Sequence, residues 1–256
     1  MKLFSLIAIV ALGAATVACG PSRGSSVAES PVTSEATTTS PEPSTEAPSP
    51  TATSTLEAEP VSLEGAFTYN EMDNYLEAIA PMVAQFFEEQ YPDIPEPDLV
   101  YIPSDRAART ACGYSDGWAY SYCGAGQSIS VGQDLLWEFY RGAGDAAPAI
   151  ALAHEWGHHV QLYAGTLGSR TASESVSVEN QADCLSGAWA RYADEQGWLE
   201  TEDDLADVET LMRYIGSAET SRRDHGTTQE RSEAFESAYE GGASACNVFF
   251  PDNPVA

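Results

Sequence analysis

The feature that most constrains this chain is the stretch at 154–158, which reads H-E-W-G-H and lies in a segment with a helical pattern. Apolar residues recur through 149–163 near a 3.6-residue period, which predicts a helix with one buried stripe and one polar face. His154 and His158 would lie one turn apart on one face, where two imidazoles can bind a single Zn²⁺. Glu155 would lie about 100° round the helix, where its carboxylate can accept a proton from water on that ion. The pattern therefore predicts a metal-dependent hydrolytic site.

Local signals agree with a helix at this place. Pro148 stands at a position typical of a first helical turn, and no proline interrupts the motif. In the alternative interpretation the helix is simply buried and its histidines make only hydrogen bonds. A third ligand would decide between the two, because catalytic zinc typically takes three protein ligands and leaves one position for water.

A second helical pattern resumes at Glu174 and supplies the candidate third ligand. Glu179 and Asp183 lie four residues apart and would share one helix face. We predict that Glu179 completes the ligand set and that Asp183 accepts a hydrogen bond from a ligand imidazole, which fixes its tautomer. The alternative is a solvated acidic helix face, which is common in chains as acidic as this one.

Two further histidines have different predicted roles. His159 lies about 100° from His158 on the helix, so we expect it to pack or form hydrogen bonds rather than bind the same ion. His225 precedes a helix that 227–230 would open with a capping box, and from such a loop it could hydrogen-bond the oxyanion of a tetrahedral intermediate. Tyr214 is a second candidate for that role, and His225 could alternatively only orient its loop.

The N-terminal segment predicts export and membrane attachment. Residues 1–18 have a short positive start and an apolar run, as in a secretory signal peptide. The run is shorter than the roughly 20 residues that span a bilayer, so an uncleaved anchor is the less favoured alternative. Residues 16–20 resemble a lipoprotein lipobox, although Thr16 stands where leucine is usual. We therefore expect lipidation of Cys19 and a location on the outer face of a bacterial membrane.

Composition separates a spacer from a folded domain. Residues 19–60 are rich in Ser, Thr, Pro and Glu, and such a segment should be a disordered tether that holds the domain away from the membrane. Residues 61–256 are long enough for one domain with its own core. The whole chain has 39 acidic and 11 basic residues, which argues against a nucleic-acid partner. We expect a monomer.

Four cysteines follow Cys19. An even number in an exported protein favours disulfides, and three connectivities are possible. We predict a pair between Cys112 and Cys123, which closes a short loop, and a pair between Cys184 and Cys246, which attaches the C-terminal tail to the domain. The alternative, a cysteine-rich zinc site, lacks the close C-x-x-C pair that such sites use.

Coarse patterning predicts an α+β fold that is predominantly helical. A helix is expected over 71–90 and a shorter one over 133–140. Strands are expected over 98–102 and 127–131, and a hairpin or loop lies over 112–123. These strands form a small β-sheet that precedes the motif helix. A strand edge near that helix would let an extended peptide add as a further strand.

The motif and its companions resemble the bacterial putative neutral zinc metallopeptidase family. The matching stretches are 154–161, 179–184 and 187–190, together with His225-Gly226, Arg231, a cysteine near the C-terminus and the region from Cys112 to Cys123. The resemblance covers nearly all of 61–250. It implies a zincin-like fold in which His154, His158 and Glu179 bind zinc and Glu155 is the catalytic residue. It does not identify a substrate.

Together these observations predict a zinc-dependent endopeptidase of the cell envelope, with one catalytic Zn²⁺ and a peptide or protein substrate. One alternative is an envelope binding protein with a structural or relict zinc site. A fourth ligand from His225 or Asp183 would favour that alternative, because structural sites leave no position for water. Another alternative is a zinc amidase that acts on cell-wall material, which needs the same activated water.

Overall fold

The computed structural model describes residues 63–168, 171–199, 201–216 and 225–256. The predicted signal peptide, Cys19 and the tether lie outside the described residues, so the domain limits at 18 and 60 stay predictions. Within the described part of the chain, none of the helices is both long and apolar enough to cross a membrane.

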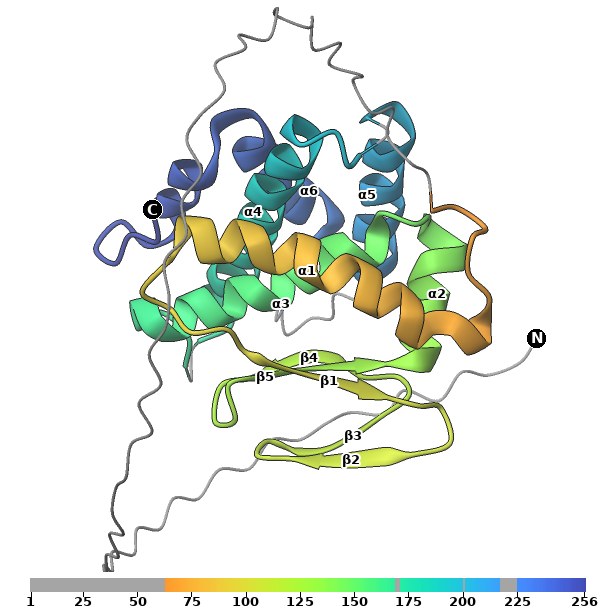
Figure 1. Cartoon of the computed structure of the whole chain (residues 1–256). Coiled ribbons are helices and arrows are strands. Elements are labelled where there is room, and N and C mark those ends of the chain that lie inside the picture. The colour runs from red at the N-terminus through yellow and green to blue at the C-terminus, as the bar shows by residue number, and fades with distance from the viewer. Residues whose placement is uncertain (1–62, 169–170, 200, 217–224) are drawn as a thin grey trace, which may run out of the picture. The chain divides into compact units, whose positions relative to one another are not determined.

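Helices make up most of the described chain, and the strands fall between the first and second helices (Figure 1). The fold is therefore α+β and predominantly helical, as predicted. The helices are α1 (Met72–Gln90), α2 (Gln133–Ala143), α3 (Ala147–Ala164), α4 (Ala172–Glu195), α5 (Thr201–Gly216) and α6 (Thr228–Gly241), with 3₁₀ turns η1 (Tyr69–Glu71) and η2 (Ala243–Phe249). The strands are β1 (Asp98–Ile102), β2 (Ala107–Thr110), β3 (Gly113–Asp116), β4 (Tyr120–Cys123) and β5 (Ser128–Gly132).

The sheet next to the motif helix has the strand order β1-β5-β4. Strand β5 is central and buried along its length; β1 pairs with it in parallel and β4 pairs with it antiparallel. Strands β2 and β3 form a separate antiparallel hairpin. Strand β4 is therefore an edge of the three-stranded sheet, and it lies against α3.

Helices α1 and α3 run across one face of the sheet, and α4, α5 and α6 lie beyond them (Figure 1). The α1–α3 contact includes Phe87 and Trp156, whose rings stack 5.1 Å apart. Trp189 of α4 is fully buried, and its indole N–H donates to the carbonyl of Met82 at 3.2 Å. This packing fixes α3 between the sheet and α4.

The strand predicted over 98–102 agrees with β1, and the one predicted over 127–131 differs from β5 by one residue at each end. The region 112–123 contains β3 and β4, while the hairpin partner of β3 lies before Cys112. Helix α5 is an additional element that periodicity did not single out. Helix α2 continues past Tyr140, the predicted end, to Ala143.

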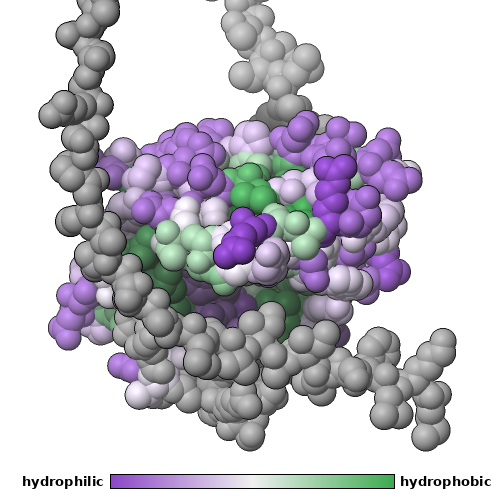
Figure 2. Space-filling model, turned by 90° about the horizontal axis from the view of Figure 1, so that it is seen from below, coloured by the Kyte–Doolittle hydropathy of each residue, from purple (hydrophilic) through white to green (hydrophobic). Residues whose placement is uncertain are grey.

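Both predicted disulfides are present. Cys112 pairs with Cys123 at a Cα–Cα distance of 5.8 Å, and Cys184 of α4 pairs with Cys246 of η2 at 5.6 Å. Disulfides are typical of proteins that mature outside the cytoplasm. Figure 2, seen from the sheet side, shows hydrophilic residues over much of the coloured part of that face, with smaller apolar areas between them.

Candidate metal centre

Helix α3 begins and ends with the expected local signals. Pro148 occupies its first turn, and Gly165 ends it in a left-handed conformation with φ of 73°. Within α3, Gly157 brings α4 unusually near: a Cβ on Gly157 would lie 3.0 Å from the Cα of Ala182. His158 directly follows Gly157, His154 lies three residues before it, and Asp183 directly follows Ala182. The close crossing of the two helices therefore brings the α4 carboxylates to the histidines.

The structure brings His154, His158 and Glu179 together as a group, here called the metal triad. One donor atom from each lies within 4.8 Å of the others. The Nε2 atom of His154 lies 3.5 Å from Oε2 of Glu179, and Nε2 of His158 lies 3.7 Å from Oε1 of Glu179. The three atoms thus face one small volume, as ligands of a single ion must.

Asp183 lies directly behind His154 and is fully buried. Its Oδ1 lies 2.8 Å from Nδ1 of His154, and its two oxygens also accept hydrogen bonds at 2.8 Å from Nε and Nη2 of Arg231 in α6. Because an ionised carboxylate only accepts, Nδ1 of His154 must carry the hydrogen. This leaves the Nε2 lone pair directed at the triad, which is the tautomer that binds a metal.

Gln161 orients the second histidine in the same way. Its Oε1 lies 2.8 Å from Nδ1 of His158, while its Nε2 donates to the carbonyl of Val178 at 2.7 Å. Because that carbonyl can only accept, the amide oxygen of Gln161 must face His158 and accept the Nδ1 hydrogen. Both imidazoles therefore present Nε2 toward Glu179.

The pKa values of the site follow from these contacts. Burial alone would raise the pKa of Glu179, but His154, His225 and His158 outweigh it and hold the pKa well below its ordinary range. Burial also opposes ionisation of Asp183, and Arg231 and His154 overcome it, so its pKa is lowered. For His154, burial opposes the charge, but Asp183 and Glu179 raise the pKa to about 10. The two carboxylates thus favour a positive charge at His154, and a metal ion at the triad would take the place of the proton on its Nε2.

Glu155 is buried and lines the same cleft as the triad. This cleft has a volume of about 460 Å³, and Tyr120, Ser121 and Tyr122 of the edge strand β4 form one of its walls. The burial of Tyr120 and the charge of Glu155 both raise the pKa of the Tyr120 hydroxyl, which donates to the carbonyl of Pro148 at 2.6 Å. Glu155 therefore faces a space where a substrate could lie.

His225 reaches the cleft from the segment before α6. Its Nδ1 lies 3.5 Å from Oε2 of Glu179, and its side chain is 53% exposed. The group of donor atoms within 4.8 Å of one another does not include it among the described residues. Tyr214 of α5 is 50% exposed and lines the same cleft. The predicted capping box at Thr227 and Glu230 is present at the start of α6.

His159 lies apart from the triad, as its helical position predicts. It is fully buried, with Nδ1 2.8 Å from the hydroxyl of Tyr122 and Nε2 2.7 Å from the carbonyl of Pro95. Burial lowers its pKa. Because a carbonyl only accepts, Nε2 donates and Nδ1 accepts from Tyr122. His159 thus attaches α3 to β4 and to the segment before β1.

Two groups of residues were not assigned roles from the sequence. Gln161 supports His158 from three residues further along α3, a spacing that a helical wheel could have revealed. A second set of carboxylates, from Asp145, Asp204 and Asp207, lies with oxygens within 4.8 Å of one another. It joins α5 to the turn between α2 and α3, away from the triad, and its acidic residues are spread too far along the sequence to form a motif.

Comparison with known proteins agrees with the site. A family model described as "Putative neutral zinc metallopeptidase" matches residues 44–249. The uncharacterized protein YpfJ of Escherichia coli is 30% identical over 191 residues, which cover 64% of this chain and 66% of that protein. An uncharacterized protein of Mycobacterium tuberculosis, Rv2575, is 29% identical over 143 residues, 46% of this chain and 49% of that one.

The chain thus spans less than two thirds of the length of these curated relatives. No solved structure matches it. The family model nevertheless covers most of the chain, including α3, α4 and α6 with the residues that meet at the triad. The chain belongs to the putative neutral zinc metallopeptidase family.

Proposed function

We propose that this protein is a zinc-dependent endopeptidase of the cell envelope with a zincin-like active site. The proposal rests mainly on the metal triad, whose three residues line the same cleft as Glu155. Two imidazole nitrogens and one carboxylate are a ligand set of catalytic zinc, and two histidines with a carboxylate favour zinc over magnesium or calcium. The residues present therefore fit the ion that the family's description implies.

His154, His158 and Glu179 would hold the ion. Zinc bound there lowers the pKa of water and polarises a carbonyl oxygen. Glu155 is the general base: its carboxylate takes the proton of the attacking water and returns it to the leaving amine. His225 donates a hydrogen bond to the oxyanion as it develops. Tyr214 is the second candidate for that last role.

The edge strand β4 favours a peptide as the substrate. It pairs with β5 along one side, and Tyr120, Ser121 and Tyr122 line the cleft along the other. An extended peptide can add to such an edge through its main-chain groups. A second hollow of about 290 Å³ shares Tyr122, His158 and Glu179 with the main cleft. Because the two hollows share these residues, an extended chain can continue past the triad from one hollow into the other, which favours an endopeptidase.

The donors around the triad favour catalytic over structural zinc. Both oxygens of Asp183 are engaged by His154 and Arg231, so Asp183 is not directed at the triad. Three donors leave one position on the ion for water. If His225 occupied that position as a fourth ligand, the zinc would be structural, and an envelope binding protein would be the second candidate function. A zinc amidase of the cell wall requires the same residues and is an outcome of the test below.

The decisive experiment compares the purified mature protein with its Glu155→Gln variant. We expect equal zinc content in both and cleavage of an unfolded protein by the parent alone, because the substitution removes the base and leaves the ligands. Cleavage of wall fragments but not of proteins would replace the peptidase with the amidase. Bound zinc without any hydrolysis by the parent would favour the binding protein.

We also propose that lipidated Cys19 attaches the protein to the outer face of the membrane, where it acts as a monomer. The two disulfides support an extracytoplasmic location. A Cys19→Ser variant is expected to move from the membrane fraction to the soluble fraction, while Cys246 stays disulfide-bonded. A variant that stays in the membrane fraction would contradict lipid anchoring through Cys19.

A further inference from the structure

Beyond the metal triad, the cleft extends into a largely apolar space between three helices, here called the apolar recess. The residues that line it come from α2, α3 and α5: Leu135, Phe139, Ile150, Leu211, Met212 and Ile215. Four of them, Phe139, Ile150, Leu211 and Met212, are at most 5% exposed. The walls of the recess are thus formed largely by core residues, and the recess is continuous with the cleft that the metal triad lines.

The recess begins next to the catalytic residues. Ile150 precedes His154 by one turn of α3, and Ala151 precedes Glu155 by one turn, so each pair shares a helix face. A peptide with its scissile carbonyl at the triad therefore has a neighbouring side chain within one helical turn of this space.

The charged side chains of the cleft belong to the triad and its neighbours, and Glu155 is the carboxylate nearest to the recess along α3. Glu179 contacts three histidines, and Asp183 pairs with Arg231, so the ionised side chains engage one another. The six described residues that form the recess walls carry no charge that could pair with an occupant, and an unpaired charge is costly to bury. We propose that the recess binds a bulky apolar side chain, such as leucine, methionine or phenylalanine, beside the bond that is cut.

This preference rests on the proposed endopeptidase function, so its test uses both cleavage and binding. Peptides of one sequence would carry Leu, Phe, Ala or Asp at the position next to the scissile bond. We expect kcat/KM to fall about 10- to 200-fold from Leu or Phe to Ala, and further for Asp. Calorimetry with the Glu155→Gln variant should give the same order of affinities without cleavage.

A matched pair of variants locates the effect. Leu135→Ala enlarges the recess and should reduce the Leu-over-Ala preference about tenfold, whereas Leu205→Ala, also half-buried on a helix but outside the cleft, should leave it unchanged. If the parent cleaves all four peptides equally well, the proposed role of the recess is wrong, while the peptidase function is supported. If the Glu155→Gln variant binds the peptides in the expected order of affinity but the parent cleaves none of them, the apolar recess is supported and the peptidase function is wrong.

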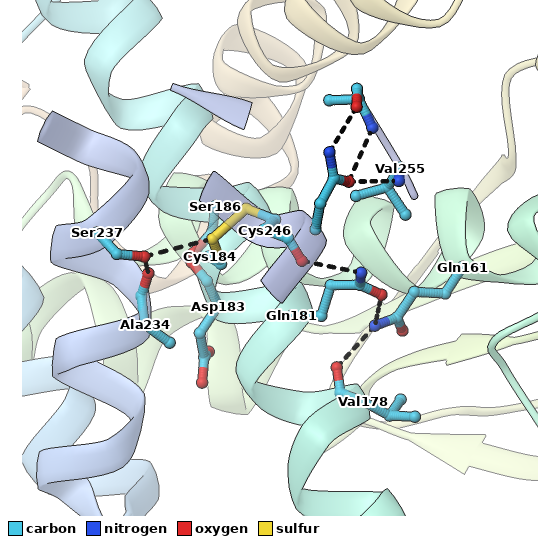
Figure 3. Close-up of a disulfide and its surroundings, with 12 residues drawn as sticks. Gln161, Val178, Gln181, Asp183, Cys184, Ser186, Ala234, Ser237, Cys246 and Val255 are labelled. Atoms are coloured by element: carbon cyan, nitrogen blue, oxygen red, sulfur yellow. Dashed lines mark hydrogen bonds between the residues drawn. A yellow bond between two sulfur atoms is a disulfide. The ribbon is translucent and has the colours of Figure 1, made fainter. Parts of the chain in front are cut away.

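A second inference comes from independent contacts around the C-terminal disulfide (Figure 3). The Nε2 atom of Gln161 donates to Oε1 of Gln181 at 3.1 Å, and Nε2 of Gln181 donates to the carbonyl of Cys246 at 3.1 Å. Both glutamines are fully buried. A continuous chain of hydrogen bonds, here called the glutamine relay, therefore joins His158 to the residue that is disulfide-bonded to Cys184.

The disulfide reaches both histidines of the triad. Cys184 directly follows Asp183, which holds His154, and Cys246 holds the far end of the glutamine relay, which orients His158. We infer that Gln161 and Gln181 are positioning residues and that the Cys184–Cys246 disulfide sets the zinc affinity of the site. Partners of this kind typically alter metal affinity 10- to 100-fold.

Zinc affinity, measured by competition with a chelator, tests the glutamine relay whether or not the protein cleaves peptides. Gln161→Met should weaken zinc binding about 10- to 100-fold, and Gln161→Glu, which keeps an acceptor for His158, should recover part of the loss. Replacing Cys184 and Cys246 by alanine should weaken zinc binding in the parent and should weaken it less in Gln161→Met, where only the route through Asp183 to His154 remains to be lost. Full additivity in this cycle would overturn the coupling.

Controls separate the glutamine relay from general loosening of the fold. Replacing Cys112 and Cys123 by alanine removes the other disulfide and should leave zinc affinity unchanged. If the Cys184 and Cys246 double variant does not fold, Gln181→Met keeps the disulfide and interrupts the same hydrogen bonds. Unchanged zinc affinity in folded Gln181→Met would contradict the proposal.

Discussion

Arg231 shows how one buried cation supports a metal site that it does not touch. Its guanidinium makes two hydrogen bonds to Asp183, which is fully buried and holds His154. The charge of Asp183 raises the pKa of Arg231 against the effect of burial. The carboxylate can therefore stay ionised inside the protein, where it keeps Nε2 of His154 free to bind zinc.

Replacing Arg231 by methionine should lower the free energy of unfolding by about 3–5 kcal/mol, because the Asp183 charge loses its buried partner. Zinc affinity should fall about 10- to 100-fold. Urea unfolding and chelator competition measure the two effects. Arg106→Met is the control: its pair with Asp105 is exposed, and its loss should cost at most about 1 kcal/mol. Equal losses in the two variants would contradict this account.

The raised pKa of Asp207 predicts how the stability of the protein depends on pH. Burial raises its pKa to about 7; the N–H of Ala146 opposes the shift, and the charges of Asp204 and Asp145 add to it. The folded protein thus holds this proton more tightly than the unfolded chain, in which the pKa is near 3.8. The stability from this proton is complete below about pH 3.8 and is lost as the pH rises through about 7.

Asp207→Asn should therefore stabilise the protein at pH 8.5 and flatten the decline in its urea midpoint between pH 5.5 and pH 8.5. Both proteins would be measured with a chelator, because neighbouring carboxylates also attract divalent cations. Parallel pH curves for the parent and the variant would count against the raised pKa.

The residues within one helical turn of the motif were predictable from the sequence. Positions of His154, Glu155 and His158 on α3 follow from helical spacing alone. The meeting of Glu179 with the histidines was a prediction about two helices, and the close contact at Gly157 is the physical reason for it. Arg231 was named from the sequence only through the family resemblance. Its contact with Asp183 was not predictable because it depends on how α6 packs against α4.

At the scale of the elements, the packing of α4 against α6 depends on Gly187. A Cβ there would lie 2.1 Å from the carbonyl oxygen of Phe235, which is backbone and cannot rotate away. Gly187→Ala should therefore lower the free energy of unfolding by about 1–3 kcal/mol despite the better helix propensity of alanine.

The matched control is Gly142→Ala in α2, where the nearest atom to a new Cβ is 4.0 Å away. It should be neutral or stabilising by up to about 1 kcal/mol. Urea unfolding compares the two, and a Gly187→Ala variant as stable as the parent would show that α6 can move away without cost.

The long helices were easier to predict than the short strands. Helix α1 shows apolar side chains at helical spacing over its whole length, and its buried residues follow that pattern. Strand β4 has only four residues, and its role depends on pairing with β5, which is a non-local contact. Sequence periodicity contains little information about a strand so short.

At the scale of the whole molecule, the net charge of −28 makes a prediction about salt. Like charges repel more strongly in the compact state, and the screening length falls from about 30 Å at 0.01 M salt to about 10 Å at 0.1 M. The urea midpoint should rise over this range. If screening is the cause, choline chloride should raise the urea midpoint as much as sodium chloride does. A urea midpoint that does not change with salt would contradict the role of charge repulsion.

The order of the site along the chain also has a consequence for biosynthesis. The histidines and Glu155 come first, Glu179 and Asp183 follow, and the supports Arg231 and Cys246 come near the end. Both histidines therefore depend on supports that are synthesised last. We expect a chain that ends before α6 to bind zinc more weakly than the full chain, even though it contains His154, His158 and Glu179.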